Sequence, residues 1–77
     1  MSILKVHDLP LYKQLKVVRV MNDLTQADLV GMLRLKDVSL LSRIERGEIP
    51  ISRYYMERIQ NFVYEGKTLV GSLEDRS

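Results

Sequence analysis

The chain has 77 residues, of which 45% are hydrophobic and 29% are charged, a composition that indicates one small folded domain and excludes a disordered chain. It contains no cysteine, which excludes disulfide bonds and thiolate metal sites. The formal net charge of +2 allows a nucleic-acid partner without requiring one.

No segment of the chain is expected to enter a membrane. No apolar run approaches the roughly 18–20 residues that span a bilayer. The first residues also lack the basic start and apolar core of a signal peptide. We therefore expect a cytoplasmic protein with no membrane partner.

Residues 1–8 are expected to form an N-terminal arm, in which a weak polar–apolar alternation fits a short strand or a disordered segment. Asp8 and Pro10 predict the start of a first helix, because a carboxylate acceptor is followed by a proline whose missing N–H costs nothing in a first turn. The apolar residues that follow at helical spacing are Leu11, Leu15 and Val18. This helix ends at Asn22 and Asp23.

Thr25 is the predicted N-cap of a second helix. Its hydroxyl can accept an N–H of the first turn, and Asp28 follows three residues later, as in a capping box. Leu29 and Leu33 lie one turn apart and form the inward face of this helix.

Asp37 is the predicted N-cap of a third helix. Leu41 and Ile44 are its expected inward pair. Gly47 stands where a residue in the left-handed conformation would end the helix.

Ser52 is the predicted cap of a fourth helix that ends at Gly66. Its buried stripe is expected to consist of Tyr55 or Met56, Ile59, Phe62 and Val63. Residues 66–77 then form a C-terminal tail with one apolar patch at 68–70, either a short strand or a segment that orders on contact. The folded domain is placed at 9–65.

Three pieces of the sequence resemble the lambda-repressor/Cro-type helix-turn-helix family. They are residues 24–26 (LTQ) with Leu29, residues 41–47 (LSRIERG), and Arg19 on the first helix. The resemblance covers residues 9–64. It implies an all-α domain of four to five helices, with short strands allowed at the termini.

The chain departs from the family pattern between the second and third helices. From Thr25 to Ser42 it has one residue more than the family usually has, which we assign to residues 34–36. Arg34 or Leu35 replaces the glycine of the family's turn, so the turn requires another geometry or some strain. Gly31 stands one position from the usual small residue and can provide close helix approach if the register shifts.

The resemblance implies a sequence-specific DNA-binding transcriptional regulator, a repressor of phage or mobile-element type, with residues 38–46 as recognition helix. Thr25 and Gln26 would lie at a helix N-terminus presented to the DNA backbone. Arg43 is the best candidate for a base contact, because a guanidinium can bind O6 and N7 of guanine together. The full set of implied DNA contacts is Thr25, Gln26, Lys36, Val38, Ser39, Ser42, Arg43, Arg46 and Arg53.

The resemblance also implies a structural ion pair between Arg19 and Glu45 and a homodimer on an inverted operator. The alternative for the pair is two ordinary surface charges. For the dimer we consider a small ribbon between residues 68–70 and 3–6.

An enzyme is not expected, and neither is a metal or another cofactor. His7 is the only histidine, and no carboxylate cluster or phosphate-binding glycine loop accompanies it. Two other binding functions stay open: a module that binds another regulator protein, and the antitoxin of a toxin–antitoxin pair. Asp37 at the proposed DNA face and an exposed Leu40 favour a protein partner.

Overall fold

The computed structural model describes residues 8–76, with side chains over residues 8–66. Over this range the chain forms four helices and no strand, which confirms the all-α prediction. The helices are α1 (Leu11–Met21), α2 (Gln26–Leu33), α3 (Val38–Glu45) and α4 (Arg53–Arg76). Residues 1–7 of the predicted N-terminal arm (1–8), with His7 among them, lie outside the described residues.

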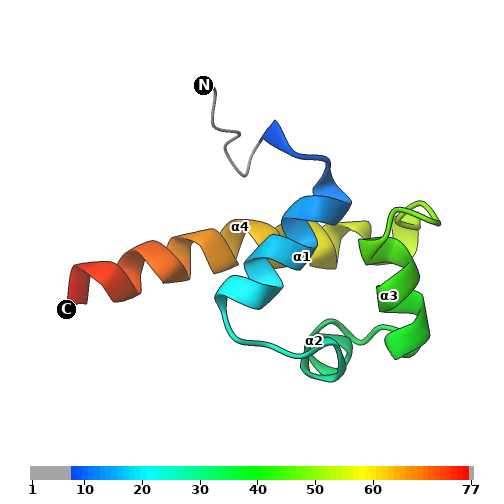
Figure 1. The fold of residues 1–77 in the computed structure, drawn as a ribbon, viewed down its shortest axis with the longest axis horizontal. Coiled ribbons are helices and arrows are strands. Elements are labelled where there is room, and N and C mark those ends of the chain that lie inside the picture. The colour runs from blue at the N-terminus through cyan, green and yellow to red at the C-terminus, as the bar shows by residue number, and fades with distance from the viewer. Residues whose placement is uncertain (1–7, 77) are drawn as a thin grey trace.

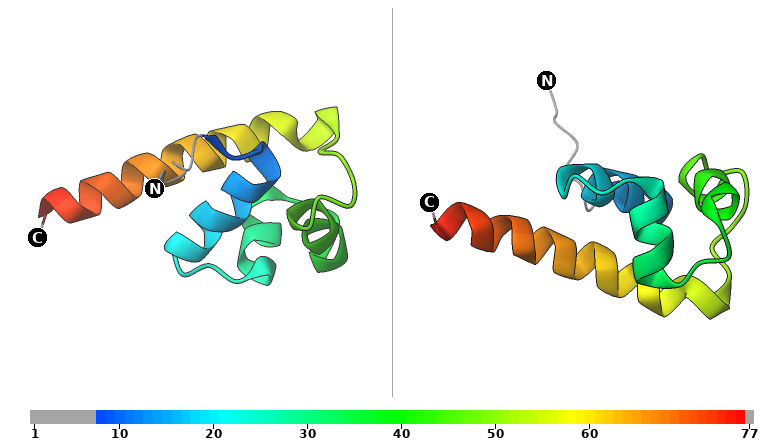
Figure 2. Two further views of the ribbon diagram at one scale, coloured as in Figure 1. Left: turned by 45° about the horizontal axis from the view of Figure 1, so that its top comes forward. Right: turned by 90° about the horizontal axis from the view of Figure 1, so that it is seen from below.

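The long helix α4 runs along one side of the molecule, and α1 packs across it (Figure 1). The two short helices α2 and α3 contact each other, α3 also contacts α1, and α2 also contacts α4. The two views of Figure 2 show α2 and α3 grouped on the side of α1 away from the C-terminal end of α4. The arrangement leaves the outer faces of α2 and α3 at the surface.

The predicted N-cap of the first helix is wrong. The N-cap residue is Pro10, with φ −57° and no side-chain cap, instead of Asp8. Proline already has the dihedral angle that a helix start needs, and its carbonyl oxygen accepts hydrogen bonds from the N–H groups of Lys13 and Gln14, both at 3.0 Å. The predicted end is confirmed, since Asn22 is the C-cap.

The predicted caps of α2 and α3 are confirmed. Thr25 Oγ1 accepts the Asp28 N–H at 3.0 Å, and the Asp28 carboxylate accepts the Thr25 N–H at 2.9 Å, which completes the capping box. Asp37 Oδ1 accepts the Leu40 N–H at 2.8 Å at the start of α3. Gly47 follows α3 with φ +74°, in the left-handed region that favours glycine.

A single apolar core joins the four helices. Its members come from α1, α2, the α2–α3 turn, α3 and α4, and the predicted inward pairs of α2 and α3 are among them. The core residues are Leu15, Val18, Leu29, Leu33, Leu35, Leu41, Ile44, Ile59 and Val63. Of the stripe predicted for α4, Tyr55, Met56 and Phe62 are half-buried, and Tyr55 and Phe62 pack against this core.

The predicted end of the fourth helix is wrong, because α4 continues past Gly66 to Arg76. Gly66 is buried and lies where α1 and α4 approach closely: a Cβ added to it would stand 2.3 Å from Cγ1 of Val18. Gly66 is therefore a packing position within α4. In the sequence, a glycine in this role looks the same as a glycine that ends a helix. The tail and the strand predicted for residues 68–70 are therefore replaced by helix, which removes the proposed ribbon with residues 3–6; residues 3–6 lie outside the described range.

No helix among the described residues has the length and hydropathy to cross a membrane.

Candidate nucleic-acid interface

The turn between α2 and α3 keeps a left-handed residue although it has no glycine. Arg34, the C-cap of α2, has φ 54° and ψ 48°. The Leu35 N–H then donates to the Val30 carbonyl at 3.0 Å. This bond from residue i to residue i−5 is typical of a Schellman motif at a helix end. Leu35 is buried in the core, which anchors the turn.

The proposed role of Gly31 in close helix approach is wrong. Apart from the backbone of α2 itself, no atom lies within 4 Å of the position that a Cβ on Gly31 would occupy. The glycine is exposed on the outer side of α2, so its environment is solvent and not a neighbouring helix.

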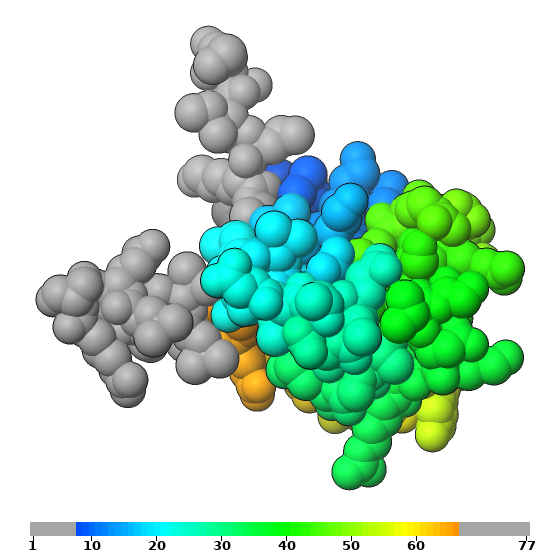
Figure 3. Space-filling view, turned by 60° about the horizontal axis from the view of Figure 1, so that its bottom comes forward, coloured from blue at the N-terminus to red at the C-terminus, as the bar shows by residue number. Residues whose placement is uncertain are grey.

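One side of α3 is exposed along the helix. Val38 is 40% exposed, and Ser39 and Arg43 are exposed one helical turn apart. The opposite side of α3, with Leu41 and Ile44, fills the core. In the space-filling view, α2 and α3 lie side by side on one face of the molecule (Figure 3).

A shallow hollow of about 240 Å³ lies on this face. Three of the predicted DNA contacts line it: Lys36, Ser39 and Arg43. The other lining residues are Asp37, Leu40 and Ile49. The expectation that Leu40 is exposed is wrong, since Leu40 is half-buried and packs against the core while it lines the hollow.

Two further predicted contacts, Ser42 and Arg46, bind each other. Arg46 donates to Ser42 Oγ at 2.8 Å and forms an ion pair with Glu48. The hydrogen bond from Arg46 holds the pKa of Glu48 below its ordinary value. Because all three side chains lie at or near the surface, a phosphate can replace Glu48 as the partner of Arg46.

The start of α2 is occupied by internal hydrogen bonds. The Thr25 hydroxyl serves the capping box, whose bonds hold the pKa of Asp28 below its ordinary value. Gln26, predicted to contact DNA, donates from Nε2 to Oε1 of Glu45 at 3.1 Å. A backbone or base contact by this amide therefore requires that it leave Glu45.

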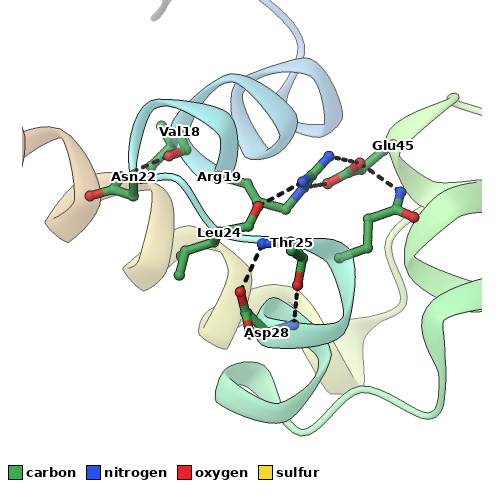
Figure 4. A network of polar contacts seen from close by, with 8 residues as sticks. Val18, Arg19, Asn22, Leu24, Thr25, Asp28 and Glu45 are labelled. Atoms are coloured by element: carbon green, nitrogen blue, oxygen red, sulfur yellow. Dashed lines mark hydrogen bonds and ion pairs between the residues drawn. The ribbon is translucent and has the colours of Figure 1, made fainter.

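Arg19 and Glu45 form a bidentate ion pair between α1 and α3 (Figure 4). Nε of Arg19 lies 2.8 Å from Oε2 of Glu45, and the second guanidinium bond measures 3.0 Å. The remaining guanidinium nitrogen donates to the Leu24 carbonyl at 2.8 Å. The side chains of Arg19 and Glu45 are 11% and 3% exposed. Together with the half-buried Gln26, the pair fixes α3 against α1 and the start of α2.

The predicted DNA contacts thus fall into separate groups. Lys36, Ser39 and Arg43 share one hollow, while Arg53 is exposed at the start of α4 and is not among the lining residues of that hollow. Sequence reasoning missed Ile49, whose place in the hollow depends on how the loop after α3 returns. Among the described residues, no group of three His, Cys, Asp or Glu side chains is placed to hold a metal ion.

Comparison of the chain with protein-family models, with curated proteins and with solved structures finds no match.

Proposed function

We propose that this protein is a sequence-specific DNA-binding transcriptional regulator in which α3 is the recognition helix. The observation that carries the proposal is the exposed side of α3, where Arg43 and the preceding Lys36 line a hollow, while the inner side of the helix fills the core. A helix held in this way can enter the major groove, which is about 12 Å wide.

The side chains on this face suit groove contacts. Arg43 can bind the O6 and N7 acceptors of guanine, and Val38 can pack on a thymine methyl group. The Ser39 hydroxyl can hydrogen-bond to a donor or to an acceptor on a base edge. Lys36 and Arg53 are exposed cations that can contact phosphates. Asp37 is the one carboxylate that lines the hollow, and its Oδ1 is bound to the backbone as the N-cap of α3.

The hydrogen-bond network of Arg19, Glu45 and Gln26 supports the same proposal. A groove-reading helix must keep a fixed angle to the rest of the domain, because bidentate base contacts tolerate little misplacement. Glu45 is the last residue of α3 and binds partners from α1 and α2. The network therefore holds the end of α3 opposite to the exposed first turn.

A single domain of this size reads few base pairs. The proposed active form is a homodimer on inverted half-sites about one helical turn, roughly 34 Å, apart. Sedimentation of the full chain with a selected duplex tests this part: two chains per duplex are expected, and one chain per duplex with half-site protection would contradict it.

The test of DNA binding is selection of a duplex from random oligonucleotides, followed by titration against salt. We expect a selected duplex to bind more tightly than a scrambled one, with a log–log salt slope of about −0.9 per phosphate neutralised. Arg43→Ala should lose about 1–3 kcal/mol of discrimination at one base position. Lys16→Ala on α1 removes the same charge outside the candidate face and should keep the discrimination. Failure to enrich any sequence would refute the proposal.

A second candidate function is binding of a regulator protein to the same face. The hollow favours it, because its lining includes the apolar side chains of Leu40 and Ile49 and the carboxylate of Asp37, which a phosphate backbone would repel. If this function holds, Leu40→Asp should abolish binding of the protein partner, and the selection from random oligonucleotides should enrich no sequence.

A further inference from the structure

The α2–α3 turn needs a partner outside its own segment. Arg34 adopts a left-handed conformation that side chains with a Cβ disfavour. The carbonyl groups at the C-terminal end of α2 also lack partners within the helix, as at every helix end. The turn leads through Lys36 and Asp37 directly into α3, so any change in its backbone moves the candidate interface.

Arg58 of α4 supplies that partner. One guanidinium nitrogen donates to the Leu33 carbonyl at 2.8 Å and to the Arg34 carbonyl at 3.2 Å, across 25 and 24 residues of sequence. Its positive charge lies at the negative end of the α2 dipole, where a cation is stabilising. Leu33 and Leu35 hold the same turn from the core side.

Two aromatic rings hold the guanidinium in place. Its central carbon lies 4.7 Å from the ring centroid of Tyr54 and 5.4 Å from that of Tyr55. The rings meet edge to face, with centroids 5.0 Å apart. Arg58 also donates to the Tyr54 carbonyl at 3.5 Å. A planar guanidinium can stack and donate at once, which a lysine ammonium cannot do in the same geometry.

We propose that Arg58 is a positioning residue for the DNA-binding face: it clamps the left-handed turn at Arg34 and thereby sets where Lys36 and the first turn of α3 lie. The inference rests on the proposed function for its consequence in DNA recognition. The clamp itself is independent of the proposed function, because Arg58 acts through the turn and lies outside the hollow lined by Lys36 and Arg43.

The clamp is tested without DNA by amide hydrogen exchange of the full chain. In Arg58→Ala, exchange of the Leu35 N–H should become about fivefold faster or more, whereas the α4 surface variant Gln60→Ala should leave the Leu35 rate nearly unchanged. Arg58→Lys, which keeps the charge, should show the same local loss. An unchanged Leu35 rate in both variants would overturn the inference.

Glycine at position 34 provides a rescue that a general loss of stability would not show. Glycine adopts the left-handed conformation without a clamp. Adding Arg34→Gly to Arg58→Ala should therefore slow Leu35 exchange back toward the wild-type rate. A double variant that exchanges as fast as Arg58→Ala alone would show that Arg58 acts elsewhere, which also overturns the inference.

The same four proteins test the consequence for DNA. In the wild-type background, Arg58→Ala should lower the ratio of selected-duplex to random-DNA affinity about fivefold; in the Arg34→Gly background it should not. Comparison within each background cancels the charge lost with Arg34. An equal fall in both backgrounds would overturn the positioning role. Wild-type protein that prefers no duplex would overturn the proposed function, and the exchange data then judge the clamp alone.

Discussion

Replacement of Glu45 by alanine should destabilise the domain more than any exposed carboxylate replacement. The change removes the acceptor of two bonds from Arg19 and one from Gln26. The Arg19 side chain, which is 11% exposed, is left with its hydrogen bond to the Leu24 carbonyl. A buried charge that loses its counter-charge is not rehydrated without local opening.

The magnitude follows from the burial of both side chains. Removing one partner of a buried, hydrogen-bonded pair costs about 3–5 kcal/mol. A domain of this length has a total free energy of unfolding of roughly 4–12 kcal/mol. The melting temperature of a domain of this size falls by about 4–8 °C per kcal/mol, so Glu45→Ala should lower it by about 12 °C or more.

The assay is thermal and urea unfolding followed by circular dichroism. Glu57→Ala on the exposed side of α4 removes the same functional group and should change the free energy of unfolding by less than about 0.5 kcal/mol. The double replacement Arg19→Met with Glu45→Leu should recover most of the loss, because an apolar pair leaves no stranded charge. A Glu45→Ala shift no larger than that of Glu57→Ala would refute the reasoning.

Three further predictions concern single positions. Gly31→Ala should stabilise the fold by about 0.5–1 kcal/mol, because alanine suits a helix interior and the added Cβ meets open space; an unchanged or lower urea midpoint would contradict this. Gly66→Ala should instead destabilise by about 1–3 kcal/mol, since its Cβ would meet Val18 at 2.3 Å, and a gain equal to that of Gly31→Ala would show that α1 and α4 do not approach closely. Hydrogen bonds from Thr25 lower the folded-state pKa of Asp28 below its ordinary value of 3.8, so the stability from ionised Asp28 is complete above that pH and is lost as pH falls through the folded pKa. Melting temperatures measured from pH 6 to pH 2 should therefore fall less steeply in Asp28→Asn than in the wild type, and parallel curves would contradict the capping role.

The elements that sequence reasoning predicted correctly depend on local chemistry. Thr25 and Asp37 cap helices with their own side chains, and each bond spans three residues. The inward pairs of α2 and α3 follow from helical spacing alone. Ser39 and Arg43 could also be grouped in advance, because residues four apart lie on one side of a helix.

The features that the sequence could not predict depend on contacts between distant segments. Gly66 carries the signal of a helix end, yet its reason is Val18, which belongs to another helix. The Gln26 amide is bound to Glu45 across 19 residues. Arg58 reaches the α2–α3 turn across 25 residues, and nothing in its local sequence marks it. Each of these contacts exists once the helices are packed and not before.

The division of α3 into a buried side and an exposed side has a consequence for redesign. Leu41, Ile44 and Glu45 carry the packing of this helix, whereas Val38 and Arg43 are exposed. Substitutions confined to the exposed positions change what α3 presents without disturbing what holds it in place. The domain can therefore serve as a scaffold for a library randomised at these positions, in which new binding preferences are selected on an unchanged fold.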